Sequence, residues 1–197
     1  MRHIILGYFM KMKNMTLLAV AVTSLISTGA LAFDKAKAGD AGLPNYYIGP
    51  EIGLAFSGTN LNLGVTGGWK YSPDIVLGAF YNYINQGSTS STNGGTAISA
   101  NASVNLFGVE AGYLLGGNLQ GAQIGAKIGA SVASASATVG TVSTSNSATS
   151  LILGPKVAYD YQIGGNFTAG GEVNLLFTTA SGGSTLTDVL GVLKYWF

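Results

Sequence analysis

The final ten residues, DVLGVLKYWF at positions 188–197, show the strict two-residue alternation that decides the fold. Counted back from the terminal Phe197, every second residue is apolar or Gly. The residues between them are mixed, and Asp188 and Lys194 among them carry charge. A membrane strand with lipid on one side and a polar barrel interior on the other needs this pattern. The segment therefore predicts one strand of a transmembrane β-barrel.

The first 32 residues have the organisation of a secretory signal peptide. Three basic residues precede an uncharged run from Met15 to Ala32, which ends in the sequence GALA. A transmembrane helix is the less favoured alternative, because this A-x-A ending is a cleavage site and a polar stretch follows it. We therefore expect a cleaved Sec-type signal peptide at 1–32, a flexible periplasmic arm at 33–44 and a barrel at 45–197.

Composition after Ala32 narrows the function classes. This part of the chain has no Cys, Arg or His, six Lys against eight acidic residues, and 28 Gly. Its net charge of −2 provides no basic surface, so no nucleic-acid partner is expected. Gly disfavours a helix interior by about 1 kcal/mol relative to Ala, and no stretch approaches the roughly 20 apolar residues of a membrane helix. A closed β-barrel is the remaining structure that can span a bilayer.

Two-residue periodicity divides the remaining chain into eight predicted strands. Short connections alternate with longer Ser/Thr-rich segments at 87–97 and 135–146, as in an antiparallel up-and-down barrel with both termini on one side. The alternation at 131–145 passes the expected membrane height. We therefore expect the fifth and sixth strands to extend outward as a ribbon whose free edge offers pairing to a partner strand. The predicted strands are 46–57, 60–71, 75–86, 98–115, 119–134, 147–161, 167–179 and 185–197.

Two further features accompany these strands. Aromatic residues of the lipid-facing register gather at the two ends of the predicted strands, as the two interfaces of a membrane favour. Pro50 and Pro155 interrupt strands, and each removes one ladder hydrogen bond from a closed barrel, so we expect a bulge at each position.

The few charged residues of the predicted strands fall on the side opposite to the lipid. An eight-stranded barrel has an interior just wide enough for side chains, and an unpaired buried charge costs several kcal/mol. Two interpretations follow: a structural ion-pair core that plugs the barrel, or a gate in which Lys and Glu exchange partners. The pairs that register predicts are Glu110 with Lys127, Lys156 with Glu172, and Glu51 with Lys70 or Lys194. The inward charges outside these pairs are Asp160 and Asp188.

Catalysis is not expected from these residues. Barrel enzymes that transfer acyl groups rely on His, usually beside Ser, and the chain has no His after the predicted cleavage site. Without His or Cys it also lacks the usual ligands for zinc, copper or haem, so neither a metal nor another cofactor is expected. A carboxylate pair of the hydrolase kind is a weak alternative, because lysines lie between the acids.

The leader, the eight alternating strands and the YWF ending resemble the small outer-membrane β-barrel proteins of Gram-negative bacteria. The group is that of the OmpA transmembrane domain, OmpX/Ail and the opacity proteins, and NYYIGPEIGLAF at 45–56 is similar to its opening strand. The resemblance implies a C-terminal signal at Tyr195 and Phe197 that the barrel-assembly machinery reads. It also implies an interior ionic cluster like that of the OmpA barrel, carried over to Glu51, Glu110, Lys127 and Lys156.

Two functions remain open at this stage. The first is a monomeric, non-enzymatic barrel of the outer membrane with a structural or surface-exposed role. Its lumen is plugged by Lys/Glu pairs, its wall contacts outer-membrane lipids, and segments 87–97 and 135–146 are offered to a surface partner. The alternative is a narrow, gated, porin-like channel for ions or small solutes.

Overall fold

The computed structural model describes residues 46–56, 60–93, 95–116, 120–179 and 183–197. The predicted signal peptide, 1–32, and the predicted arm, 33–44, lie outside these residues. Within the described part of the chain, no helix is long and apolar enough to cross a membrane.

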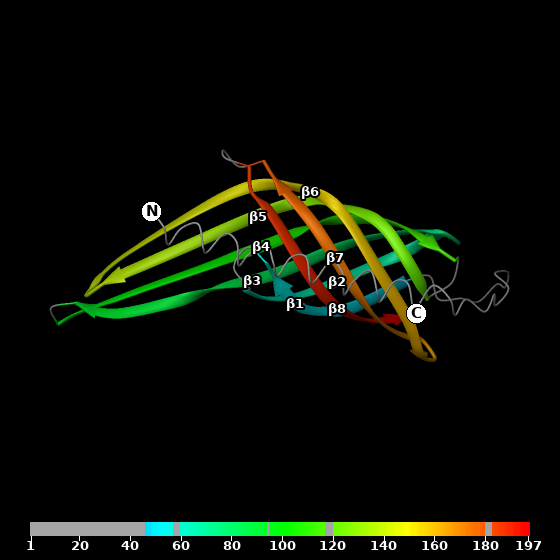
Figure 1. The fold of residues 1–197 in the computed structure, drawn as a ribbon, viewed down its shortest axis with the longest axis horizontal. Helices are drawn as coiled ribbons and strands as arrows, with labels where there is room; N and C mark the ends of the chain where they lie inside the picture. The colour runs from blue at the N-terminus through cyan, green and yellow to red at the C-terminus, as the bar shows by residue number, and fades with distance from the viewer. Residues whose placement is uncertain (1–45, 57–59, 94, 117–119, 180–182) are drawn as a thin grey trace, which may run out of the picture. The chain divides into compact units, whose positions relative to one another are not determined.

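Eight antiparallel strands pair in chain order and close into a barrel, because β1 pairs with β8 as well as with β2 (Figure 1). The predicted fold class is confirmed. Short strands form one part of the wall and four longer strands form the other. The strands are β1 (Tyr46–Ala55), β2 (Asn60–Ser72), β3 (Ile75–Asn93), β4 (Thr96–Leu115), β5 (Gly121–Val139), β6 (Val142–Gly164), β7 (Phe167–Thr178) and β8 (Thr185–Trp196).

The barrel wall is apolar outside and largely polar inside, which reverses the arrangement of a protein that folds in water. Outward-pointing residues such as Ile52, Ile128 and Leu153 are each more than half exposed. Their inward neighbours are buried, and Lys127 and Lys156 are only 1% and 2% exposed. A continuous exposed apolar wall of this kind requires lipid as its solvent.

Aromatic side chains mark the end of the barrel where β1 begins and β8 ends. Phe197 stacks on Tyr46 with ring centroids 6.0 Å apart, and Tyr195 contacts Phe167 at 5.0 Å. We call this end the terminal end and the opposite end the rim. Aromatic rings with polar atoms prefer the boundary between lipid and water. The outward aromatic residues at the terminal end are Tyr46, Trp69, Tyr71, Tyr113, Tyr159, Tyr161, Phe167, Tyr195 and Phe197.

Strands β3 to β6 continue past the rim as a four-stranded sheet, visible at the left of Figure 1. We call this part, residues 85–93, 96–105, 132–139 and 142–150, the rim sheet. Pairing of β2 with β3 stops at Asn62 and Ile84, and that of β6 with β7 stops near Leu151 and Thr179. On these two sides the sheet edges have no partner strand among the described residues.

The rim sheet corrects the interpretation of 87–97 and 135–146 as loops. The described residues of both segments belong mainly to paired strands, which continue up to the pairs Asn93 with Thr96 and Val139 with Val142. Their Ser, Thr and Asn content is typical of loops, but their two-residue alternation continues that of the barrel. The predicted ribbon of two strands is therefore half of a sheet of four strands.

The two prolines do not form the expected bulges. Pairing of β1 with β8 skips Gly49 and Pro50 and resumes in the same register, and pairing of β6 with β7 skips Gly154 and Pro155 in the same way. The ladder is interrupted locally without an extra residue. The register shifts occur instead after Lys70, Asn85 and Gln162.

Candidate functional site: the charged lumen

Four charged side chains from four consecutive strands meet inside the barrel. They are Glu110 on β4, Lys127 on β5, Lys156 on β6 and Glu172 on β7, and we call them the lumen quartet. Lys156 Nζ lies 2.8 Å from Glu110 Oε2 and 3.0 Å from Glu172 Oε2. Lys127 Nζ contacts Glu172 and lies 3.6 Å from Glu110 Oε2. Each lysine therefore bridges both carboxylates, and the charges of the quartet sum to zero.

Strand register explains why these four side chains fit together. Glu110 and Lys127 are direct cross-strand neighbours, so their side chains start side by side. The residue of β6 opposite Lys127 is Gly154, and the residue of β5 opposite Lys156 is Gly125. A Cβ at Gly154 would clash with the backbone of Leu175, and one at Gly125 with the backbone of Ala111, so Gly at these positions lets the strands that carry the lysines approach their neighbours closely.

Hydrogen bonds hold the two carboxylates of the quartet in place. Glu110 Oε1 accepts hydrogen bonds from the Tyr47 hydroxyl at 3.0 Å and from the Thr66 hydroxyl at 3.2 Å. Glu172 Oε1 accepts a hydrogen bond from Asn174 Nδ2 at 2.7 Å. Buried charges are tolerated where an opposite charge and hydrogen bonds replace the lost water. The quartet meets this condition.

The same network extends to a third carboxylate, that of Asp188 on β8. Asn174 Nδ2 donates to Asp188 Oδ1 at 2.6 Å, and Asn62 Nδ2 donates to Asp188 Oδ2 at 3.2 Å. Asn174 thus joins Glu172 to Asp188. These amides were not among the predicted site residues, although their inward place in the alternation was a signal that could have found them.

Glu51 does not form the pairs that were predicted for it. Its Oε2 accepts a hydrogen bond from Asn82 Nδ2 at 2.7 Å, and its Oε1 accepts none from the described residues. Lys194 pairs instead with Asp160, at 2.6 Å. Lys70 lies six positions along β2 from Gly64, the residue opposite Glu51, and is therefore too far along the strand to reach it. The pairs predicted for Glu51 were based on the register of neighbouring strands in the sequence, which does not show how far along the barrel axis each side chain lies.

Apolar layers cover the charged layer on both sides. Towards the rim, Phe80, Ile84, Leu106, Ile152 and Leu176 belong to one buried cluster, and Lys127 Nζ lies 4.6 Å from the Phe80 ring centroid. Towards the terminal end, Tyr47, Val76, Leu114 and Trp196 form a second cluster. Trp196 Nε1 donates to Thr168 Oγ1 at 3.1 Å, which satisfies its buried N–H. The lumen is thus filled in three layers.

The predicted C-terminal signal residues lie outside the lumen. Tyr195 and Phe197 point outward, with their ring centroids 6.1 Å apart. The backbone of Phe197 exchanges two hydrogen bonds with Tyr46, at 2.9 and 3.0 Å. These contacts close the barrel between its first and last strands. Among the described residues, no group of three or more His, Cys, Asp or Glu is arranged to hold a metal ion.

Neither a protein-family model nor a curated protein sequence matches this chain. Solved structures do match it, and the following three each cover 80% of this chain and the whole of the matched chain. Ail of Yersinia pestis, in complex with the heparin analogue sucrose octasulfate, has 12% identity and a TM-score of 0.60. Neisserial surface protein A has 12% identity and a TM-score of 0.54. The N-terminal β-barrel domain of Pseudomonas aeruginosa OprF has 13% identity and a TM-score of 0.51.

These matches define a class of fold. The chain has the fold of the small, eight-stranded outer-membrane β-barrels, and the resemblance drawn from the sequence is confirmed at this level. At identities of 12–13% the likeness concerns the fold alone.

Proposed function

We propose that this protein is a non-enzymatic barrel of the bacterial outer membrane, with a closed lumen and a structural, surface-displaying role. In this proposal, the terminal end faces the periplasm and the rim sheet stands outside the cell. The neutral lumen quartet carries the proposal, because four mutually paired charges fill the barrel at its charged layer. A barrel that contacts lipid with its wall and displays the rim sheet at the cell surface needs no pore for this role.

The energetics of the quartet support a closed lumen. An ion or solute that passes through the charged layer has to separate at least one lysine from its two carboxylates. Breaking a buried pair costs about 3–5 kcal/mol. The apolar cluster around Leu106 and Ile152 would also have to open towards the rim. The cost of separating the ion pairs and the cost of opening the apolar cluster both favour a closed lumen over a path for ions or solutes.

A narrow gated channel is the second candidate, and one observation favours it. Glu51 Oε1 is buried and accepts no hydrogen bond from the described residues. It is an acceptor to which a lysine of the quartet could move. A gate of this kind would exchange a Lys127–Glu172 contact for a Lys127–Glu51 contact, which leaves the total charge of the lumen unchanged.

The free edges of the rim sheet give the surface-displaying role a physical basis. Residues 142–150 of β6 have no strand beside them on the β7 side among the described residues. This edge carries no charge and no proline, the two devices that usually block strand addition. We propose that it accepts an extended segment of a surface partner by β-augmentation.

Single-cysteine labelling tests the proposed placement, because the natural sequence contains no Cys. Ser145→Cys lies in the rim sheet and Asn166→Cys lies in the turn at the other end of β6. In intact cells, a membrane-impermeant maleimide is expected to label Ser145→Cys and to leave Asn166→Cys unlabelled. Permeabilised outer membranes should label both variants. The reverse pattern, or labelling of both in intact cells, would contradict the placement.

A further inference from the structure

The outward face of the barrel changes its chemistry where the strands pass the rim. Just below the rim, the outward cross-strand row is Tyr81, Phe107, Ala130 and Leu151. The next outward row, Tyr83–Asn105–Val132–Thr149, is mixed, and the three successive outward rows above it consist of Ser, Thr and Asn alone. We call these rows the hydroxyl face. They are Asn85–Ser103–Ser134–Ser147, Ser88–Asn101–Ser136–Ser145 and Ser90–Ser99–Thr138–Ser143.

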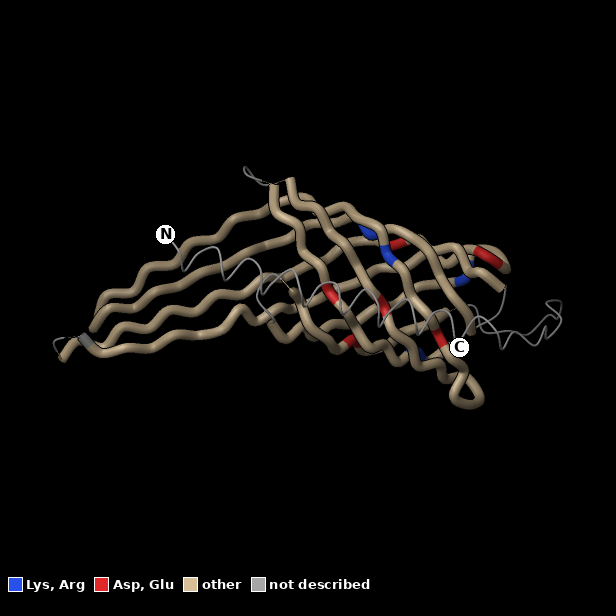
Figure 2. The backbone as a smooth tube through the Cα atoms, in the orientation of Figure 1, with Lys and Arg blue, Asp and Glu red and all other residues tan. Residues whose placement is uncertain are grey.

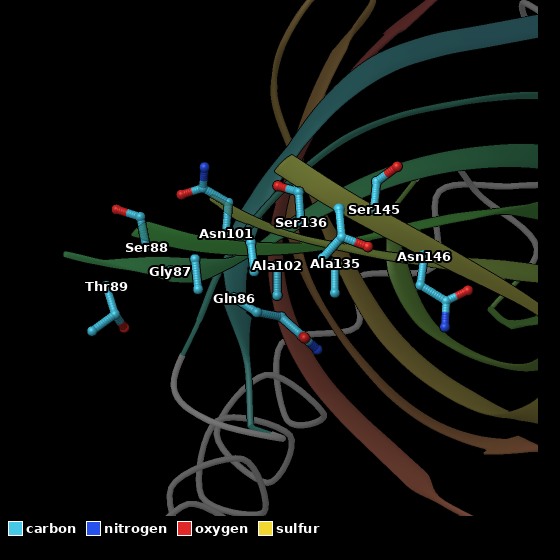
Figure 3. A pocket seen from close by; sticks show the side chains of 13 residues that line it. Gln86, Gly87, Ser88, Thr89, Asn101, Ala102, Ala135, Ser136, Ser145 and Asn146 are labelled. Atoms are coloured by element: carbon cyan, nitrogen blue, oxygen red, sulfur yellow. The ribbon is translucent and has the colours of Figure 1, made fainter. Parts of the chain in front are cut away.

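The opposite face of the rim sheet is mostly apolar. Ala100, Ala102, Ala135 and Ala137 lie there, with Ile98 and Val139 near the tip. Figure 3 shows the two directions: Ser88, Asn101, Ser136 and Ser145 point to one side, whereas Gln86, Thr89 and Asn146 point to the other. The Ser, Thr and Asn residues are therefore concentrated on one face of the rim sheet. A loop rich in these residues would not show such a separation into faces.

A hollow of about 550 Å³ lies at the base of the hydroxyl face. Most of its lining belongs to this face, with Asn85, Ser103, Ser134 and Ser147 beside Tyr83, and the rest is Ala102, Ala135 and Asn146 of the opposite register. Immediately below, the Tyr81 hydroxyl donates to Asn105 Oδ1 at 2.7 Å, so aromatic and amide groups share this boundary. Hydroxyl and amide groups offer both donors and acceptors, beside aromatic rings that present an apolar surface.

Charge selects among the ligands that such a surface fits. Residues 85–105 and 132–150 contain no Lys, Arg, Asp or Glu, and Figure 2 shows the rim sheet without charge. Phosphate and sulfate groups are usually bound by Arg or Lys. An uncharged array of hydroxyls and amides instead matches a ligand that is itself rich in uncharged hydroxyls, which is a neutral saccharide.

Continuity with the lipid-facing wall identifies where this saccharide comes from. A lipid whose chains lie against Phe107 and Leu151 places its headgroup against the rows above them on the same strands, first the mixed row that contains Tyr83 and then the hydroxyl face. Strand residues rise about 3.3 Å each, so the three rows span the height of an extended headgroup. We propose that the hydroxyl face binds the neutral saccharide headgroup of glycolipids that surround the barrel. This inference rests on the membrane placement proposed above.

Native mass spectrometry of the folded protein in lauryldimethylamine oxide, a detergent without sugar, tests the proposal. The probe is digalactosyldiacylglycerol, and phosphatidylcholine with the same acyl chains is the reference lipid. Free digalactose tests for a soluble sugar. The variant Ser103→Ala/Ser134→Ala/Ser147→Ala removes one hydroxyl row. The matched control, Thr89→Ala/Ser91→Ala/Thr144→Ala, removes three hydroxyls from the opposite face.

The expected result is that the galactolipid binds the natural protein about tenfold more tightly than phosphatidylcholine, since three modest hydrogen bonds suffice for this difference. The row variant should lose this preference and the control should keep it. Equal binding of both lipids, an equal loss in both variants, or binding of free digalactose as tight as that of the lipid would overturn the proposal. Failure of every lipid to bind would contradict the membrane barrel itself, which separates the two failures.

Discussion

Replacing Lys156 with Met is expected to lower the free energy of unfolding by about 3–5 kcal/mol. Lys156 is 2% exposed, and its Nζ contacts Glu110 and Glu172 at 2.8 and 3.0 Å. Without it, two buried carboxylates share Lys127 as their lysine partner. Met has a similar volume, so the loss measures the missing charge more than a cavity. Unfolding in urea of protein inserted in liposomes, followed by Trp fluorescence, provides the measurement.

A charge-balanced double variant is the control for this prediction. Lys156→Met/Glu110→Gln removes one charge of each sign and leaves Lys127 opposite Glu172, so it is expected to recover more than half of the lost stability. The Gln side chain can still accept a hydrogen bond from Tyr47. A single variant within 1 kcal/mol of the natural protein would show that the quartet does not act as a coupled charge group.

Deletion of Phe197 is expected to reduce the amount of folded barrel in the outer membrane severalfold. Two effects contribute. The first is the loss of the contacts with Tyr46, which are the ring contact, 6.0 Å between centroids, and two backbone hydrogen bonds; the second is the loss of the C-terminal aromatic that the family resemblance assigns to assembly. Refolding in detergent separates them. The heat-dependent gel shift of a folded barrel should persist in vitro, while its amount in outer-membrane fractions falls.

Phe177→Ala is the matched control for the Phe197 deletion. Phe177 is also a lipid-facing aromatic residue, 50% exposed, but it lies at the rim end of β7. Its removal should leave the amount in the outer membrane nearly unchanged. Equal amounts of the two variants in the outer membrane would contradict a role of Phe197 in assembly. Failure of the Phe197 deletion to refold in detergent would show that the deletion acts on stability and not on assembly.

The barrel could be predicted from the sequence because lipid outside and polar groups inside impose a two-residue period on every strand. Segment 188–197 shows this clearly, and all eight predicted strands exist. The ends of the long strands could not be predicted in the same way. Above the rim, the outward rows change from apolar residues to Ser, Thr and Asn, so the lipid-facing pattern no longer distinguishes a strand from a Ser-rich loop.

The charged lumen was predictable in part. The inward direction of Glu110, Lys127, Lys156 and Glu172 follows from alternation, and the contact of Glu110 with Lys127 follows from strand register. The bridging of Lys156 to Glu110 does not, because it depends on the stagger of the strands around the closed barrel. The same stagger brings Lys194 to Asp160 and leaves Glu51 with Asn82.

Single-channel conductance in a planar bilayer tests the closed lumen most directly. The refolded protein should be recorded beside Glu110→Gln, which removes one charge of the quartet while keeping the shape of the side chain. The closed-lumen account predicts no discrete openings from either protein at voltages the bilayer withstands. Discrete openings of the natural protein, with a frequency or size that changes in Glu110→Gln, would contradict the plug and establish the quartet as a gate.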